Sequence, residues 1–101
     1  MRHESEFRLA PDHPVFAGHF PGRPIVPGVM LLDAVYQLAA RAAELDGPNW
    51  KINAIKFLNP LGPDEIARVH CDIDAVGTVR FEVVAGNRSI AAGSLSLQRL
   101  A

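Results

Sequence analysis

Hydrophobic and polar residues alternate in five separate stretches of the chain, and one longer stretch is almost continuously apolar. In residues 3–10, the first alternating stretch, Phe7 and Leu9 alternate with Glu6 and Arg8. The other four alternating stretches follow the apolar one, at residues 50–57, 68–75, 78–83 and 89–99. Successive side chains of a strand point to opposite faces, so each stretch predicts an antiparallel strand with one face on a core.

The alternation changes phase within residues 50–57. Ile52 and Ala54 share one phase, whereas Ile55 and Phe57 share the other. An extra residue inserted in a strand produces this shift. The stretch therefore predicts either a β-bulge or a strand that is covered on both faces.

The apolar stretch, residues 28–45, predicts one long helix. Pro27 and Gly28 suit a helix start, and the following Gly47-Pro48 pair ends the helix. At about 100° per residue its polar side chains fall on one narrow stripe. They are Asp33, Gln37, Arg41 and Glu44. A helix that is apolar on its other sides needs cover from several directions.

These elements predict an α+β fold in a single domain that spans residues 1–101. The expected order is one strand, the long buried helix, and four more strands in a meander. An antiparallel sheet of about five strands wrapped around one central helix is the hot-dog arrangement. One sheet covers only one side of such a helix, and a domain this small buries a modest fraction of its surface. The pattern therefore also favours a dimer.

Composition narrows the possible partners and compartment. The formal net charge is −1, from 10 basic and 11 acidic residues, so the chain lacks the basic excess typical of nucleic-acid binding. The N-terminus is charged, and no stretch has the length of a membrane span. Cys71 is the single cysteine and cannot form an internal disulfide. We expect a cytoplasmic protein that binds neither nucleic acid nor membrane.

Several kinds of chemistry lack their residues in this sequence. No two histidines have metal-ligand spacing, and no glycine-rich phosphate loop or G-x-S-x-G motif is present. Cys71 alternates onto the presumed core face, so we expect a buried apolar residue rather than a nucleophile. The sequence predicts no metal and no cofactor.

Three residues carry candidate chemistry. His19 lies in a loop made rigid by three prolines, and an imidazole titrates near neutrality. Gly28 lies at the predicted helix start, where free N–H groups favour a developing negative charge. Asp33 lies within an apolar helix and could act as an acid if it is desolvated.

Each of these residues also has a plainer interpretation. A loop histidine beside a glycine is often a surface or packing residue, and Gly28 is also a suitable helix-start residue. The stripe that contains Asp33 is also what an ordinary amphipathic helix presents to water. The residues taken alone leave these alternatives open.

The segment from His19 through Gln37 resembles the 3-hydroxyacyl-[acyl carrier protein] dehydratases of fatty acid synthesis. Their pattern, H-F-P-G-x-P-x-x-P-G-V/C-x-x-x-[E/D]-A-x-x-Q, is met at every fixed position. Residues 55–60 resemble the family's strand that enters a proline turn. Residues 61–65 resemble its P-x-x-P-G-D segment with the glycine displaced. The likeness extends from residue 3 to residue 100.

The resemblance implies a hydro-lyase that converts a (3R)-3-hydroxyacyl thioester on acyl carrier protein to the trans-2-enoyl thioester, without a cofactor. In that family two subunits share each active site. By resemblance, His19 would remove the α-proton, and Asp33 of the partner subunit would help to protonate the leaving hydroxyl. The Gly28 amide would hold the thioester carbonyl.

Five further residues take supporting roles by resemblance. The Ile25 carbonyl would orient the imidazole, and Gln37 would position the carboxyl group through a hydrogen bond. Phe20 and Val29 are candidates for the wall of the acyl tunnel. Arg23, beside the catalytic loop, is a candidate for docking the acidic carrier protein.

The sequence departs from the family at two points. The N-terminal extension that helps to shape the acyl tunnel is expected to be absent, which leaves the acyl chain length open. Asp33 replaces the usual Glu, as in the branch that also isomerises a trans-2 to a cis-3 double bond. Short dehydratases of this type also occur in polyketide-like pathways such as aryl polyene synthesis.

Two other functions remain as alternatives. Hot-dog thioesterases also carry a carboxylate on the helix, but they usually lack the H-F-P-G loop. A non-catalytic acyl-binding or partner subunit would keep the fold without turnover. The sequence also leaves a homodimer, a trimer of dimers and a heterodimer with a related subunit open.

Overall fold

The structure is a computed structural model and describes residues 2–16, 25–43 and 49–98. Within these ranges it contains five β-strands, one short 3-10 helix and one α-helix. Their bounds are β1 Arg2–Phe7, η1 Pro14–Phe16, α1 Gly28–Ala43, β2 Asn49–Phe57, β3 Ala67–Ile73, β4 Thr78–Ala85 and β5 Arg88–Gln98.

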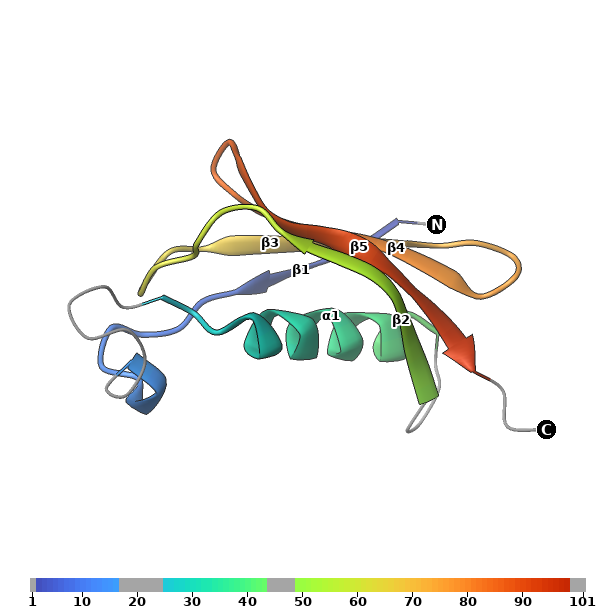
Figure 1. Cartoon of the computed structure of the whole chain (residues 1–101), viewed down its shortest axis with the longest axis horizontal. Coiled ribbons are helices and arrows are strands. Elements are labelled where there is room, and N and C mark those ends of the chain that lie inside the picture. The colour runs from blue at the N-terminus through green and yellow to red at the C-terminus, as the bar shows by residue number, and fades with distance from the viewer. Residues whose placement is uncertain (1, 17–24, 44–48, 99–101) are drawn as a thin grey trace.

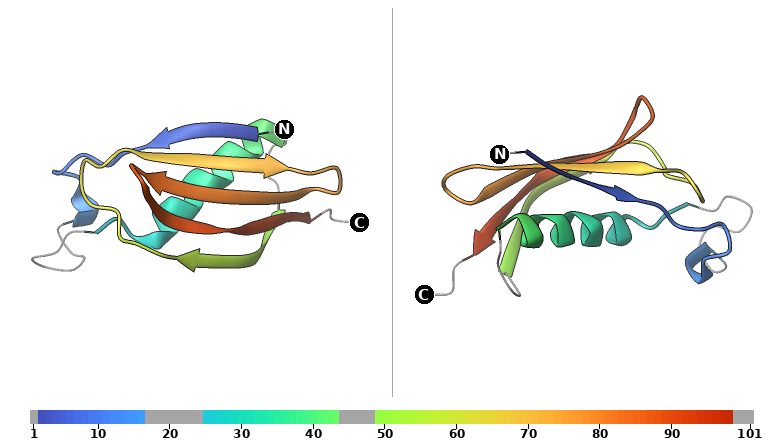
Figure 2. Two further views of the ribbon diagram at one scale, coloured as in Figure 1. Left: turned by 90° about the horizontal axis from the view of Figure 1, so that it is seen from above. Right: turned by 180° about the vertical axis from the view of Figure 1, so that it is seen from behind.

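The five strands form one antiparallel sheet, and α1 lies across one of its faces (Figure 1). Seen from above, α1 runs diagonally beneath the strands (Figure 2). The predicted architecture, one antiparallel sheet over one long central helix, is confirmed.

The strand order is β1-β3-β4-β5-β2, so the predicted meander of four strands is wrong for β2. β1 pairs with β3 from Arg2↔Asp72 to Phe7↔Ala67 and thereby fills the edge position beside β3. The remaining place for β2 is beside β5 at the opposite edge. Alternation along a strand indicates which face a side chain takes, but it does not indicate which strand lies alongside.

The core lies between α1 and the sheet. On α1 the side chains of Leu31, Val35, Leu38 and Ala39 are buried, a spacing that places them on one side of the helix. Opposite them, the alternating core-facing positions of β3 and β4 are buried, as the period of two predicts. They are Ala67, Val69, Cys71, Val79, Phe81, Val83 and Ala85.

Of the two alternatives predicted for residues 50–57, β2 has the β-bulge, because its pairing register shifts between Ile52 and Ala54. The bulge brings β2 very close to Gly93 of β5. A Cβ atom built on Gly93 would lie 2.1 Å from the Ala54 carbonyl oxygen. Glycine is therefore the only residue that fits this position without a backbone shift.

The helix covers the two ends of the sheet unequally. It packs mainly against β1, β3 and β4, which together form the covered half. At the other edge, β2 and the loop at residues 58–66 form the open half. On the helix-facing side of β2, Ile52 is 41% and Phe57 is 54% exposed. Within one chain, the expected cover of α1 from several directions is therefore incomplete.

Candidate active site

An apolar pocket of about 320 Å³ lies where α1 begins beside the end of β2. Its walls come from the segment before the helix, the first turn of the helix, and the chain that leaves β2. They are Ile25, Val26, Pro27, Gly28, Leu31, Phe57, Leu58, Asn59, Pro60 and Leu61. The pocket therefore contains two of the predicted site residues, Ile25 and Gly28.

Gly28 is the first residue of α1 and contacts the ring of Phe57. A Cβ atom at Gly28 would lie 2.7 Å from the ring atom Cζ of Phe57, too close for normal contact. The absence of a side chain lets the ring close over the start of the helix. The first N–H groups of a helix have no carbonyl partner within it, so this wall of the pocket offers donors to an anionic oxygen.

Asp33 and Gln37 lie one helical turn apart and are joined by a hydrogen bond. The side-chain nitrogen Nε2 of Gln37 donates to Oδ2 of Asp33 at 2.8 Å. This spacing brings two side chains together on a helix surface. The bond has the geometry that the resemblance implies for a positioned carboxyl group.

Asp33 belongs to an exposed stripe along α1 that consists of Val29, Asp33, Gln37 and Arg41. Val29 is 71% exposed and is not among the residues that line the pocket. Asp33 was expected to act as an acid only if it is desolvated. Within one chain the residue is exposed, so this condition is not met. The stripe and the pocket also face apart, since Asp33 lies about 160° around the helix from Leu31.

The other three predicted residues, His19, Phe20 and Arg23, lie outside the described residues. The described part of the chain thus brings Ile25 and Gly28 together in the pocket. It also joins Asp33 to Gln37 on the exposed stripe, and it places these two groups on different sides of α1.

The contribution of residues 58–61 to the pocket was missed from the sequence. Leu61 is 1% exposed, and its carbonyl accepts a hydrogen bond from the Val26 backbone N–H at 2.8 Å. Pro60, within the proline turn, was the available signal for this loop. Its approach to Val26 is a tertiary contact that no local pattern indicates.

Cys71 is buried in the core, as predicted, and is chemically suited to packing. Burial raises the pKa of its thiol, and the negative charge of Asp72 raises it further. The thiolate needed for nucleophilic attack is therefore disfavoured. Among residues 2–16, 25–43 and 49–98, no three acidic, cysteine or histidine side chains are placed to hold a metal ion. No helix in these ranges has the length and apolar character of a membrane span.

The sequence matches the ApeI-like family, described as ApeI dehydratase, over residues 1–94. It is also similar to 3-hydroxyacyl-[acyl-carrier-protein] dehydratase FabZ of Chlamydia trachomatis, with 33% identity over 98 residues. That alignment covers 84% of this chain and 64% of the relative. The resemblance to these dehydratases is confirmed. The chain spans roughly half of the curated relatives it matches, 44% of one and 64% of another.

Among solved structures, the chain resembles the dehydratase heterocomplex ApeI:P from Xenorhabdus doucetiae, with a TM-score of 0.80 and 28% identity. The match covers 98% of this chain and 95% of that one. The fluoroacetyl-CoA thioesterase FlK superposes with a TM-score of 0.73 at 17% identity, covering 97% of this chain and 85% of that one. The second likeness shows the shared fold alone.

Proposed function

Because the chain belongs to the ApeI-like dehydratase family, we propose that it removes water from a 3-hydroxyacyl thioester carried by acyl carrier protein. The C–H bond at C2 breaks and its proton passes to a base. A double bond forms between C2 and C3, and the C3–O bond breaks. The hydroxyl takes up a proton and leaves as water, so the reaction is redox-neutral and requires no redox cofactor.

The pocket at the start of α1 supplies the half of the site that receives the thioester. Its walls are apolar apart from backbone groups and Asn59, which suits an acyl chain. The Gly28 amide holds the thioester carbonyl as negative charge develops on its oxygen. Loss of one such donor typically lowers kcat by about 10² to 10³. His19 is the base, and the Ile25 carbonyl orients its ring.

The exposed stripe supplies the acid. Asp33 protonates the leaving hydroxyl, and Gln37 holds its carboxyl group through the 2.8 Å hydrogen bond. Covering the stripe with a second chain would exclude bulk water from around Asp33 and enclose it with the substrate.

The observation that carries this proposal is the separation of the two halves on one chain. The pocket contains Gly28, whereas Asp33 lies on the exposed stripe about 160° around the helix from Leu31 in the pocket wall. A complete site therefore needs the pocket of one chain and the stripe of another. The open half supports this pairing, because Ile52 and Phe57 leave apolar surface uncovered there.

The second chain is another copy of this protein or a related subunit. The similar structure from Xenorhabdus doucetiae is a heterocomplex, which supports the second arrangement. The carrier protein is the other partner, with Arg23 beside the catalytic loop as its basic contact. Phe20 and Val29 line the acyl channel, Val29 from the stripe of the second chain.

The first experiment measures hydration of crotonyl-carrier thioester and dehydration of the 3-hydroxybutyryl form, followed by longer chains. We expect His19→Ala and Asp33→Asn each to lower kcat by about 10² to 10⁴, the usual contribution of a general base or acid. Asp72→Asn is the matched control, because this exposed carboxylate lies on β3. Turnover that survives either of the first two substitutions would rule out the assigned pair.

Mixing the two inactive variants tests the shared site. Dissociated His19→Ala and Asp33→Asn chains, when mixed at random and reassociated, should recover about a quarter of wild-type activity, because half of the dimers then contain one intact site of two. No recovery from mixed dimers would place both residues in one chain. Thiol release without enoyl formation would indicate a thioesterase instead.

A further inference from the structure

The loop at residues 58–66 is held by three consecutive residues at the start of β5. The Ile90 carbonyl accepts hydrogen bonds from the backbone N–H groups of Leu58, at 2.9 Å, and Asn59, at 3.4 Å. The Ser89 carbonyl accepts one from the Asn59 side chain at 2.8 Å. The pairing register of β4 with β5 shifts between Val83 and Val84, next to the β5 residues that form these bonds.

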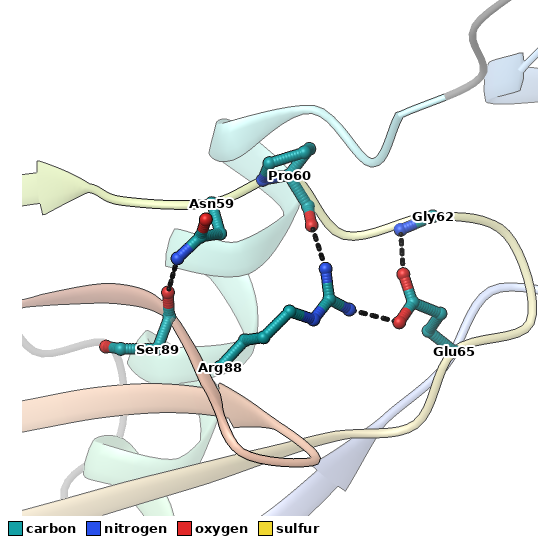
Figure 3. A network of polar contacts seen from close by, with 6 residues as sticks. All are labelled: Asn59, Pro60, Gly62, Glu65, Arg88 and Ser89. Carbon is teal, nitrogen blue, oxygen red and sulfur yellow. Dashed lines mark hydrogen bonds and ion pairs between the residues drawn. The ribbon is translucent and has the colours of Figure 1, made fainter.

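Arg88 completes the attachment by reaching into the bend of the loop, as Figure 3 shows. Its guanidinium forms an ion pair with Glu65 and donates to the Pro60 carbonyl at 3.3 Å. The other oxygen of Glu65, Oε1, accepts a hydrogen bond from the Gly62 backbone N–H at 2.8 Å. Arg88 and Glu65 thus join Pro60 to Gly62, the two residues that flank Leu61 in the chain.

Leu61 connects this part of the loop to the pocket through a backbone hydrogen bond. Its side chain is buried and its carbonyl accepts the hydrogen bond from Val26, two residues before the start of α1. Only Pro27 separates Val26 from Gly28. The position of the Gly28 amide therefore depends on the position of the Leu61 peptide.

We propose that Arg88 and Glu65 are positioning residues that fix the loop, so that Leu61 holds Val26 and with it the Gly28 amide in the pocket wall. This inference rests on the proposed function for its catalytic consequence, but its structural part does not. The Arg88–Glu65 pair is only partly buried, with both side chains 40% exposed. Such a pair adds little to stability by itself, so its importance here lies in the geometry it fixes.

The test combines amide hydrogen exchange with steady-state kinetics on Arg88→Met and Glu65→Gln, using the full chain. Arg2→Met is the matched control, because it removes the exposed Arg2–Glu4 pair at the far edge of the sheet. In Arg88→Met and in Glu65→Gln we expect the Val26 amide to exchange at least about tenfold faster, while core amides such as that of Val83 keep their rates.

The kinetic readout separates positioning from general stability. We expect Arg88→Met and Glu65→Gln each to lower kcat about tenfold with KM nearly unchanged, because the lost contact acts on the amide that holds the thioester carbonyl. Arg88→Lys should restore part of kcat by keeping the charge. Arg2→Met should match wild type in both readouts.

Three outcomes would overturn the inference: unchanged Val26 exchange in both Arg88→Met and Glu65→Gln, equal acceleration of Val26 and the core amides, or an unchanged kcat when Val26 exchange rises. A wild-type chain without turnover, both alone and with the related subunit, would instead defeat the proposed function. Val26 exchange would then still decide whether Arg88 and Glu65 hold the segment before α1.

Discussion

Phe81 and Phe57 lie on the same face of the same sheet, but their surroundings differ completely. Phe81, in the covered half, is 5% exposed beneath α1, whereas Phe57, in the open half, is 54% exposed beside the pocket. The covered half completes its core within one chain. The open half leaves the core-facing side chains of Ile52 and Phe57 partly uncovered, and the stripe of α1 is likewise exposed. One chain therefore contains a closed core in the covered half and an uncovered apolar surface beside the pocket.

Replacing each phenylalanine by alanine gives the largest expected difference between the halves. Phe81→Ala should lower the free energy of unfolding by about 3 to 5 kcal/mol, because it leaves a cavity in a closed core. Phe57→Ala should lower it by about 1 kcal/mol or less in dilute protein, since much of the ring already contacts water. Urea denaturation of both variants measures these losses.

Protein concentration sharpens this test. If a second chain covers the open half, the loss caused by Phe57→Ala should grow as the protein is concentrated, because the variant weakens association. The loss caused by Phe81→Ala should stay nearly constant. Equal losses in dilute protein would show that the two halves are equally covered and would remove the basis of the comparison.

Two glycines give the next largest effect. In Gly93→Ala the new Cβ atom would lie 2.1 Å from the backbone oxygen of Ala54, so the strand itself must shift. We expect a loss of about 3 kcal/mol in unfolding free energy. In Gly28→Ala the obstacle is the half-exposed Phe57 ring, which can turn away, so the loss should stay below about 1 kcal/mol.

Thermal or urea unfolding of Gly93→Ala and Gly28→Ala measures these losses. The difference shows whether the neighbouring group is fixed, like the Ala54 backbone, or movable, like the Phe57 ring. Gly28→Ala should nevertheless lower kcat clearly, even though it lowers the unfolding free energy little. The reason is that the displaced Phe57 ring forms part of the pocket wall. A Gly28→Ala loss as large as that of Gly93→Ala would mean that the Phe57 ring is held as firmly as strand backbone.

The fold was predictable where the signal is local. The period of two in β3 and β4, the apolar run of α1 and the bulge in β2 all follow from neighbouring residues. The place of β2 beside β5 was not predictable in this way. It depends on β1 filling the edge beside β3, a contact between segments about 65 residues apart.

The candidate site divides in the same manner. The Asp33–Gln37 hydrogen bond follows from a spacing of four on a helix. The pocket depends on the loop after β2 reaching the segment before α1, and neither stretch alone indicates the meeting. The catalytic roles come from resemblance and stay predictions until the variants are measured.

Substitution of Asp64 gives the smallest expected effect. It tests the second attachment of the loop, to Arg8 and Leu9 after β1. Asp64 is the one residue other than glycine with a positive φ, 64°, in the described ranges, and it stands where the family's P-x-x-P-G-D pattern has glycine. Its backbone N–H donates to the Leu9 carbonyl at 2.8 Å, and its carboxylate pairs with Arg8. Asparagine tolerates this backbone conformation and keeps the backbone bond.

Asp64→Asn therefore removes only an exposed ion pair, and the unfolding free energy should change by less than about 0.5 kcal/mol. Val26 exchange and kcat should stay at wild-type values, in contrast to Glu65→Gln one residue further along. If Asp64→Asn instead matched Glu65→Gln in both readouts, the loop would be held as strongly from the segment after β1 as from β5. The position of the pocket wall could then not be attributed to Arg88 and Glu65 alone. The contacts of Asp64 with Arg8 and Leu9 would contribute to it equally.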